Sequence, residues 1–276
     1  MLKPQRTTES LSVHFSVSKE LFFDEGDMKS EALRFLIAFL ACNMGKYFPA
    51  EYLNTKYEAE KDVSWADLIY KFRMKWKNAR NLDDDGLQLI LTTEKGYGIN
   101  PALQVIVDVI LAEELMRAID DASDKLAKIE LLRKFHALFQ GEFMGTTFTR
   151  NSFIRENRLH YKLKYIEKME VLMELLIEQG DYNGAAGDCN DILKMYPDSA
   201  DIHFWRMVAL YKQGYIDLVR EIDENLRELL DERTYSILCR RLQLELNITD
   251  EMLDACQESK MIFLRLDEEK RKINMH

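Results

Sequence analysis

Residues 68–81 read LIYKFRMKWKNARN and carry five cationic side chains in a chain of 276 residues whose formal net charge is −10. Within this stretch Ile69, Phe72 and Trp76 recur every three or four residues, which predicts a helix with one apolar face that packs on a core. The opposite face of the predicted helix carries Asp67, Tyr70, Lys71, Met74, Lys75 and Asn78.

The segment that follows this helix has strand character. It reads LILTTEKGYGI at residues 89–99, and residues 88–91 and 97–99 are predicted to pair as a hairpin around TTEKG. Residues 12–23, SVHFSVSKELFF, alternate in polarity and predict two short strands. Strands are therefore expected on both sides of the helical part of this region.

Three helices are predicted between these strands. The first covers residues 30–42, and the second has Pro49 in its first turn and runs to about Tyr57. The third is the cationic helix, with Ser64 as its N-cap and Asp67 at the capping-box position. An order of strands, three helices and a hairpin predicts a winged helix. The apolar stripe of the first helix consists of Leu33, Leu36, Ile37 and Leu40.

The second half of the chain contains an internal repeat. EQGDYNGA begins at Glu178 and KQGYIDLV begins at Lys212, so Gly180 and Gly214 are 34 residues apart, which is the period of a tetratricopeptide helix pair. Pro197 stands where such a pair would end. Residues 226–246 are interpreted as a third, degraded unit. The apolar faces before the two glycines are Leu172, Leu175 and Leu176, and then Trp205, Val208, Ala209 and Leu210.

The predicted fold class is therefore mainly α. An N-terminal α+β winged helix is expected over residues 1–107, and an all-α tetratricopeptide-like domain over residues 108–276. Residues 1–107 have a net charge of −1 and the remainder −9, whereas residues 64–80 alone have +4. The cations are thus concentrated on one predicted helix of an acidic protein.

Composition and motifs argue against a membrane protein and against an enzyme. No apolar run reaches the roughly 18–20 residues that cross a bilayer, and no signal-peptide pattern begins the chain, so a cytoplasmic protein is expected. No catalytic triad order, phosphate loop or GxGxxG is present, and no cofactor is expected. The four cysteines are widely spaced, which predicts free thiols: Cys42, Cys189, Cys239 and Cys256.

Metal binding is not predicted either. The five histidines have no ligand spacing. NLDDDGLQLILT, which begins at Asn81, partly imitates a calcium loop, but its twelfth position is Thr92 in place of the bidentate glutamate.

The order of these motifs resembles that of bacterial transcriptional regulators which join a response-regulator-type winged helix to a bacterial transcriptional activator domain, such as the Streptomyces antibiotic regulatory proteins. In that family the third helix has an apolar residue, Leu-Arg three and four positions later, and Leu at seven; here Ile69, Phe72-Arg73 and Trp76 fill these places. The Thr-rich strand and Gly96-Tyr97 match the family's hairpin. QVIVDV at 104–109, ALFQGEF at 137–143 and the repeat glycines follow in the family's order.

Two positions depart from the family's pattern. The Leu-Trp pair at the end of the second helix is replaced by LNTKY, with Tyr57 at its end. The arginine that the family's wing often offers to the minor groove is replaced by Thr93, and Lys95 is the nearest cation.

The resemblance implies a sequence-specific regulator of transcription, and an activator by analogy. It would read the major groove of double-stranded DNA with the helix at 64–80 and contact the backbone with the wing at 89–99. The helical half would contact RNA polymerase, form a homodimer or respond to an effector. The expected DNA contacts are Tyr70, Lys71, Arg73, Met74, Lys75, Lys77, Asn78 and Lys95.

The residues leave a second interpretation open. A protein-interaction adaptor would use the helical repeats, and its winged helix would no longer bind DNA. The net charge of −10, the acidic DDD beside the cationic helix and the threonine at the wing favour it.

Overall fold

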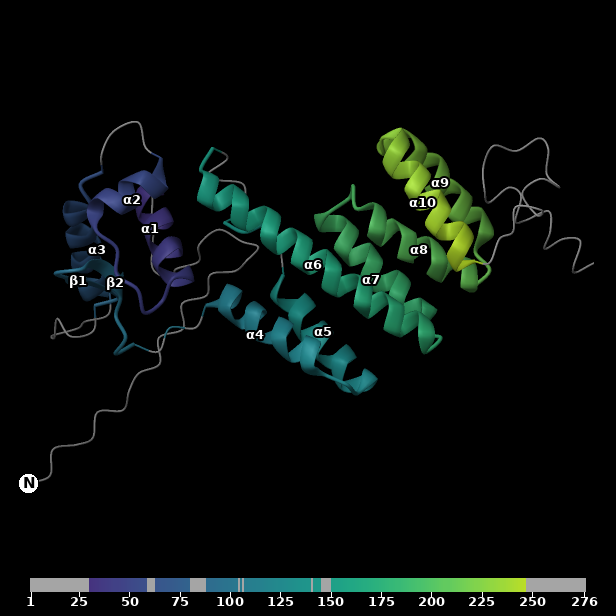
Figure 1. Cartoon of the computed structure of the whole chain (residues 1–276), viewed down its shortest axis with the longest axis horizontal. Helices are drawn as coiled ribbons and strands as arrows, with labels where there is room; N and C mark the ends of the chain where they lie inside the picture. Colours follow the sequence, from purple (N-terminus) through teal and green to yellow (C-terminus); the bar gives the residue numbers. More distant parts are fainter. Residues whose placement is uncertain are drawn as a thin grey trace, which may run out of the picture. The chain divides into compact units, whose positions relative to one another are not determined.

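The computed structural model describes residues 30–58, 63–79, 88–103, 105, 107–139, 141–144 and 150–246, and for residues 76–79 the backbone alone (Figure 1). The strands predicted at residues 12–23 and the NLDDDG segment lie outside this part of the chain. The described residues form ten helices and one two-stranded sheet. The mainly α fold class, with a small sheet near the N-terminus and an all-α region after it, is confirmed.

Contacts between residues divide the chain into two compact units. Unit 1 consists of residues up to 122 together with residues 134–163, and unit 2 consists of residues 123–133 together with residues from 164 onward. The helices α5 (Lys125–Leu138) and α6 (Ser152–Glu178) therefore contribute residues to both units. The domain boundary at 107/108 stays a prediction.

The central helix of unit 1 is α1 (Glu31–Cys42). It begins after Ser30, whose hydroxyl accepts a hydrogen bond from the backbone N–H of Leu33 at 3.4 Å, and it ends directly before Asn43. Apolar residues occupy more than one face of α1, so other elements can pack around it. Its buried residues are Leu33, Phe35, Leu36, Ile37, Ala38, Phe39, Leu40 and Ala41.

Two further helices complete the three-helix part of unit 1. The helix α2 (Ala50–Tyr57) buries only Leu53, and Pro49, predicted in its first turn, is instead the N-cap residue directly before it. The helix α3 (Trp65–Ala79) begins directly after Ser64, the predicted N-cap. All three predicted helices are thus present, with ends within one or two residues of the predicted ones.

The hairpin consists of β1 (Ile90–Thr93) and β2 (Gly96–Ile99), which pair antiparallel with Thr93 opposite Gly96. Its loop is therefore Glu94-Lys95, shorter than the predicted TTEKG, and its first strand begins two residues later than predicted. The two threonines join the ladder because β-branched residues suit a strand. Gly96 has φ 113, and this positive φ closes the short loop.

The second strand of the hairpin also pairs with the segment before α2. The backbone N–H of Phe48 donates to Tyr97 O, and the N–H of Tyr97 donates to Phe48 O, each at 2.9 Å. A Cβ added to Gly96 would lie 2.1 Å from Phe48 O, and one added to Gly98 would lie 2.7 Å from Lys46 O. The two glycines of GYG are thus required by the close approach of two backbones.

The other helices of unit 1 come from α4 (Asp108–Asp121), the end of α5 and the start of α6. The Tyr161 hydroxyl on α6 donates to Glu113 Oε1 on α4 at 3.2 Å. Arg158 Nε, also on α6, donates to Phe143 O at 2.9 Å. These contacts hold the start of α6 within unit 1.

Unit 2 contains the predicted repeat. The helix α6 ends two residues before Gly180, and α7 (Tyr182–Met195) follows; α8 (Ala200–Lys212) ends two residues before Gly214, and α9 (Ile216–Leu229) follows. Both glycines have positive φ, 78° and 86°, which is typical of a helix C-terminus. The apolar residues predicted to precede each glycine are buried: Leu172, Leu175, Leu176, Trp205, Val208, Ala209 and Leu210.

The predicted third unit at residues 226–246 has different boundaries. Residues 226–229 complete α9, and α10 (Glu232–Glu245) is a separate helix. The break follows from local capping, because Asp231 Oδ1 accepts hydrogen bonds from the N–H groups of Arg233 and Thr234 at 3.1 and 3.0 Å.

Charged side chains join the helices of unit 2. Arg241 on α10 forms an ion pair with Asp201 on α8 and donates to Glu170 Oε1 on α6 at 2.9 Å. Its guanidinium lies 4.3 Å from the ring centroid of Phe204. One arginine therefore bridges three helices.

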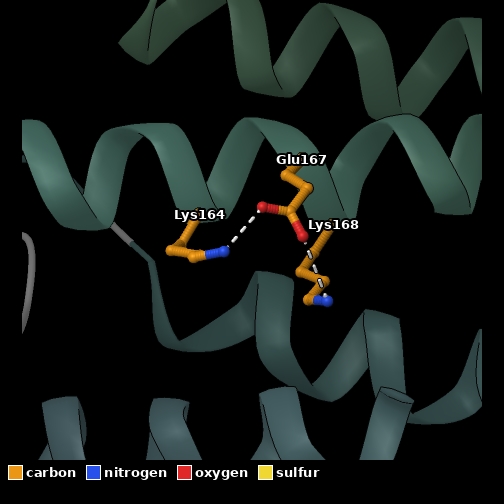
Figure 2. Close-up of polar contacts among 3 residues, drawn as sticks. All are labelled: Lys164, Glu167 and Lys168. Atoms are coloured by element: carbon orange, nitrogen blue, oxygen red, sulfur yellow. Dashed lines mark hydrogen bonds and ion pairs between the residues drawn. The ribbon is translucent and has the colours of Figure 1, made fainter.

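A second charged group lies along α6 (Figure 2). Lys164 Nζ donates to Glu167 Oε2 at 2.8 Å, and Lys168 Nζ to Glu167 Oε1 at 3.4 Å. The hydrogen bond from Lys164, together with the charges of both lysines, lowers the pKa of Glu167. Because the Lys168 side chain is buried, Glu167 supplies charge that offsets the cost of burying an ammonium group.

Candidate nucleic-acid interface

The N-terminus of α3 is fixed by contacts with α2. The buried Trp65, its first residue, donates through Nε1 to Asn54 Oδ1 at 2.7 Å, and the same oxygen accepts from Val63 N at 3.2 Å. The indole also packs edge-on against Tyr57, with ring centroids 5.7 Å apart. Asn54 and Tyr57 therefore place the beginning of the cationic helix, a role that the sequence pattern did not predict for Asn54.

The two faces of α3 differ as the periodicity predicts. Ile69 and Phe72 are buried, with 1% and 6% of their surface exposed, whereas Tyr70 and Met74 are 64% and 44% exposed. Lys71 and Lys75 are also exposed. The side chains of Trp76, Lys77 and Asn78 lie outside the described part of α3. For the residues up to 75, the apolar face lies in the core and the cationic face is exposed to solvent.

Arg73 joins α3 to the hairpin. Its Nε and Nη2 donate to Ile90 O at 3.1 and 2.8 Å, and Nη2 also donates to Thr92 Oγ1 at 2.8 Å. A planar guanidinium suits such a forked contact with a strand. Arg73 thus fixes β1 against the cationic helix. Periodicity places Arg73 beside the apolar stripe, but this partner 17 residues away was not predicted.

The tip of the hairpin presents one exposed cation, Lys95. Its backbone N–H donates to Thr93 Oγ1 at 3.2 Å, and the Thr93 hydroxyl donates to Gly96 O at 3.2 Å. Thr93, at the position of the family's wing arginine, therefore stabilises the turn. Tyr97 is half-buried, and its backbone pairs with Phe48.

The described residues also bear on metal binding, membrane insertion and thiol chemistry. Within the described part of the chain, no group of three or more His, Cys, Asp or Glu could hold a metal ion, and no helix is long and apolar enough to cross a membrane. Cys42, Cys189 and Cys239 are free thiols, and Cys256 lies outside the described residues. Desolvation raises the pKa of Cys42 and of Cys189 to about 12, so both thiols are protonated at neutral pH.

Comparisons with known proteins agree with this architecture. The chain is similar in structure to Mycobacterium tuberculosis EmbR, solved in complex with a low-affinity phosphopeptide, with a TM-score of 0.57 and 13% sequence identity. The similarity covers 84% of this chain and 64% of the EmbR chain, so this chain spans less than two thirds of the EmbR chain. At this identity the similarity shows a shared fold. No curated protein matches the sequence.

The family match comes from the second half of the chain. The model of the bacterial transcriptional activator domain matches residues 107–248, which is more than half of the 276 residues. This match confirms the resemblance to bacterial regulators of the Streptomyces antibiotic regulatory type. The chain therefore belongs to the bacterial transcriptional activator domain family.

Proposed function

We propose that the protein is a sequence-specific DNA-binding regulator of transcription, and an activator. The observation that carries the proposal is the exposure of Lys71 and Lys75 on α3, next to a hairpin that presents Lys95. The family to which residues 107–248 belong supports it. Binding to chromosomal DNA would place the protein in the cytoplasm.

In the proposed complex α3 lies in the major groove. Tyr70, Lys71, Met74 and Lys75 would face the base edges and the flanking phosphates, and Lys77 and Asn78 would continue this face along the helix. Lys95 would contact a phosphate from the wing. Arg73 would act on the DNA indirectly, because its contacts with Ile90 and Thr92 position the wing.

The net charge of −10 is compatible with this proposal because the cations are concentrated. Residues 1–107 have a net charge of −1, and the remaining residues have −9. Repulsion between the acidic remainder and DNA is long-range and screened by salt, whereas contacts of lysines with phosphates are short-range. Binding is expected to weaken steeply as salt rises.

The test is DNA binding by the full-length chain. A sequence would first be selected from genomic fragments in excess competitor DNA, and its affinity would then be measured at several salt concentrations. Lys71→Ala with Lys75→Ala is expected to weaken binding by about tenfold or more and to reduce the slope of log affinity against log salt by about 1.8, or about 0.9 for each lost phosphate contact.

A matched control removes two other exposed lysines. Lys194→Ala with Lys212→Ala changes the net charge by the same amount, but these residues lie on α7 and α8 of unit 2. The control is expected to bind like the unchanged chain. Equal losses in both double variants would mean a general charge effect and would remove Lys71 and Lys75 from the proposed interface.

A protein-interaction adaptor is the second candidate, and the net charge of −9 over residues 108–276 favours it. In that case no fragment would be selected over competitor at any salt concentration. Capture of one fragment in excess competitor would contradict the adaptor function.

A further inference from the structure

We propose that Asn151, Ser152 and Glu58 form a clasp that sets the position of α3 for DNA binding, although none of the three contacts DNA. This inference rests on the proposed DNA-binding function. The clasp connects the end of α2 to the start of α6 within unit 1. Asn151 and Ser152 lie in the stretch that matches the activator domain, residues 107–248, and Glu58 lies outside it.

The contacts of Asn151 serve two helices at once. Its Nδ2 donates to Lys56 O and Tyr57 O, the carbonyls at the end of α2, at 2.9 and 3.0 Å. Its Oδ1 accepts from Ile154 N in the first turn of α6 at 3.1 Å. Asn151 is only 6% exposed. One buried amide thus satisfies carbonyl groups at one helix terminus and an N–H group at another.

Glu58, at the end of α2, caps the start of α6 in turn. It follows α2 in a left-handed conformation, with φ 56, and its carboxylate accepts from Ser152 N at 2.9 Å and from the Ser152 hydroxyl. A carboxylate at a helix N-terminus is favoured by the partial positive charge there. Each helix therefore supplies a group that caps the other.

The clasp matters for α2 because this helix has little stability of its own. It has eight residues and buries only Leu53, and so short a helix depends on contacts outside itself. Phe153, next to the clasp, packs edge-on against Phe39 of α1, with centroids 5.0 Å apart. The end of α2 is therefore held by a segment that is itself anchored on α1.

The path from the clasp to α3 is short. Tyr57, whose carbonyl accepts from Asn151, packs against Trp65, the first residue of α3. Asn54, one turn earlier on α2, accepts the hydrogen bond of the Trp65 indole. A shift at the end of α2 would therefore move the N-terminus of the helix proposed to enter the major groove. Base contacts depend on the placement of that terminus.

Two substitutions separate this role from simple capping of α6. Asn151→Asp and Asn151→Ser both keep a side-chain oxygen that can cap α6, since Asp and Ser are good N-cap residues. Asp replaces the donor with an oxygen that repels Lys56 O and Tyr57 O, and Ser is too short to reach them. Asp231→Ala is the control, because it removes the N-cap of α10 in unit 2.

The full-length variants would be compared in two measurements: affinity for the selected DNA, and hydrogen exchange of a peptide covering residues 63–72. Asn151→Asp is expected to raise the dissociation constant about tenfold and Asn151→Ser about threefold, with faster exchange at residues 63–72 in both. Asp231→Ala is expected to stay within about twofold of the unchanged chain, with no change in that peptide.

The outcomes distinguish the two proposals. Unchanged affinity and unchanged exchange in folded Asn151→Ser would overturn the clasp, as would a loss of affinity in Asp231→Ala equal to that in the Asn151 variants. If Asn151→Asp does not fold, the affinity and exchange of Asn151→Ser alone test the clasp. If the unchanged chain selects no DNA, the proposed function fails, and exchange at residues 63–72 still decides whether the clasp holds α3.

Discussion

The wing of unit 1 and the helical repeat of unit 2 both depend on a glycine with positive φ, but for different physical reasons. At Gly96 a Cβ would lie 2.1 Å from Phe48 O, whereas at Gly214, with φ 86, a Cβ would meet no atom within 4 Å. The wing needs glycine for space and for backbone conformation, and the repeat needs it for conformation alone. In unit 1 the glycine is therefore needed because a larger residue would not fit, whereas in unit 2 it is needed only to end a helix in a left-handed conformation.

Gly96→Ala is expected to have the largest effect. The added methyl group overlaps the backbone of Phe48, and alanine is strained at φ 113, so the cost is expected to be about 3 kcal/mol or more. Chemical denaturation would measure the loss, and faster hydrogen exchange should be confined to peptides of unit 1. A variant as stable as the unchanged chain would contradict the close approach of β2 to residue 48.

Gly214→Ala is expected to cost less, roughly 1–2 kcal/mol, because only the left-handed conformation opposes it. Gly214→Asn should recover most of that loss, since asparagine tolerates this conformation. At Gly96 asparagine should give no recovery, because the overlap with Phe48 persists. If asparagine restored stability at both positions, the two glycines would be needed for the same reason, and the proposed steric requirement at Gly96 would be wrong.

The smallest expected effects concern two carboxylates, one in each unit, that cap helix N-termini. Hydrogen bonds from Ser152 lower the pKa of Glu58, and hydrogen bonds from Thr234 lower the pKa of Asp231. A lowered folded-state pKa adds stability above the unfolded-state pKa, and this stability is lost as pH falls through the folded-state pKa. Glu58→Gln and Asp231→Asn should each destabilise the protein at pH 7.

The measurement is denaturation of each variant and of the unchanged chain from pH 7 down to about pH 3. The difference caused by each substitution should shrink below about pH 4. Arg155 and Lys56 also attract Glu58, so added salt should reduce the effect at that site. A difference that is constant with pH would show that the carboxylate charge does not contribute.

Local patterns predicted much of the fold. The spacing of Ile69 and Phe72 identified the buried face of α3, and the 34-residue spacing of Gly180 and Gly214 identified the repeat. Such features depend on residues within one or two turns of each other, so periodicity and capping chemistry reveal them.

Partners distant in the sequence could not be predicted in this way. Arg73 is bound by a strand 17 residues later, and Asn151 by carbonyls about 95 residues earlier. A helical period shows which side of an element is buried but not what covers it. The short loop of the hairpin was missed for a related reason, since the pairing of β2 with Phe48 helps to define its register.

The protonated thiols have a practical consequence. Cys42 belongs to unit 1 and Cys189 to unit 2, and thiolate is the form that alkylating reagents attack. The Cys189 side chain is fully buried and its pKa is raised to about 12, so it should react slowly at neutral pH until its surroundings open, whereas Cys42 is only half-buried. Alkylation of Cys189, measured by mass spectrometry, would therefore report the opening of unit 2 without any engineered label.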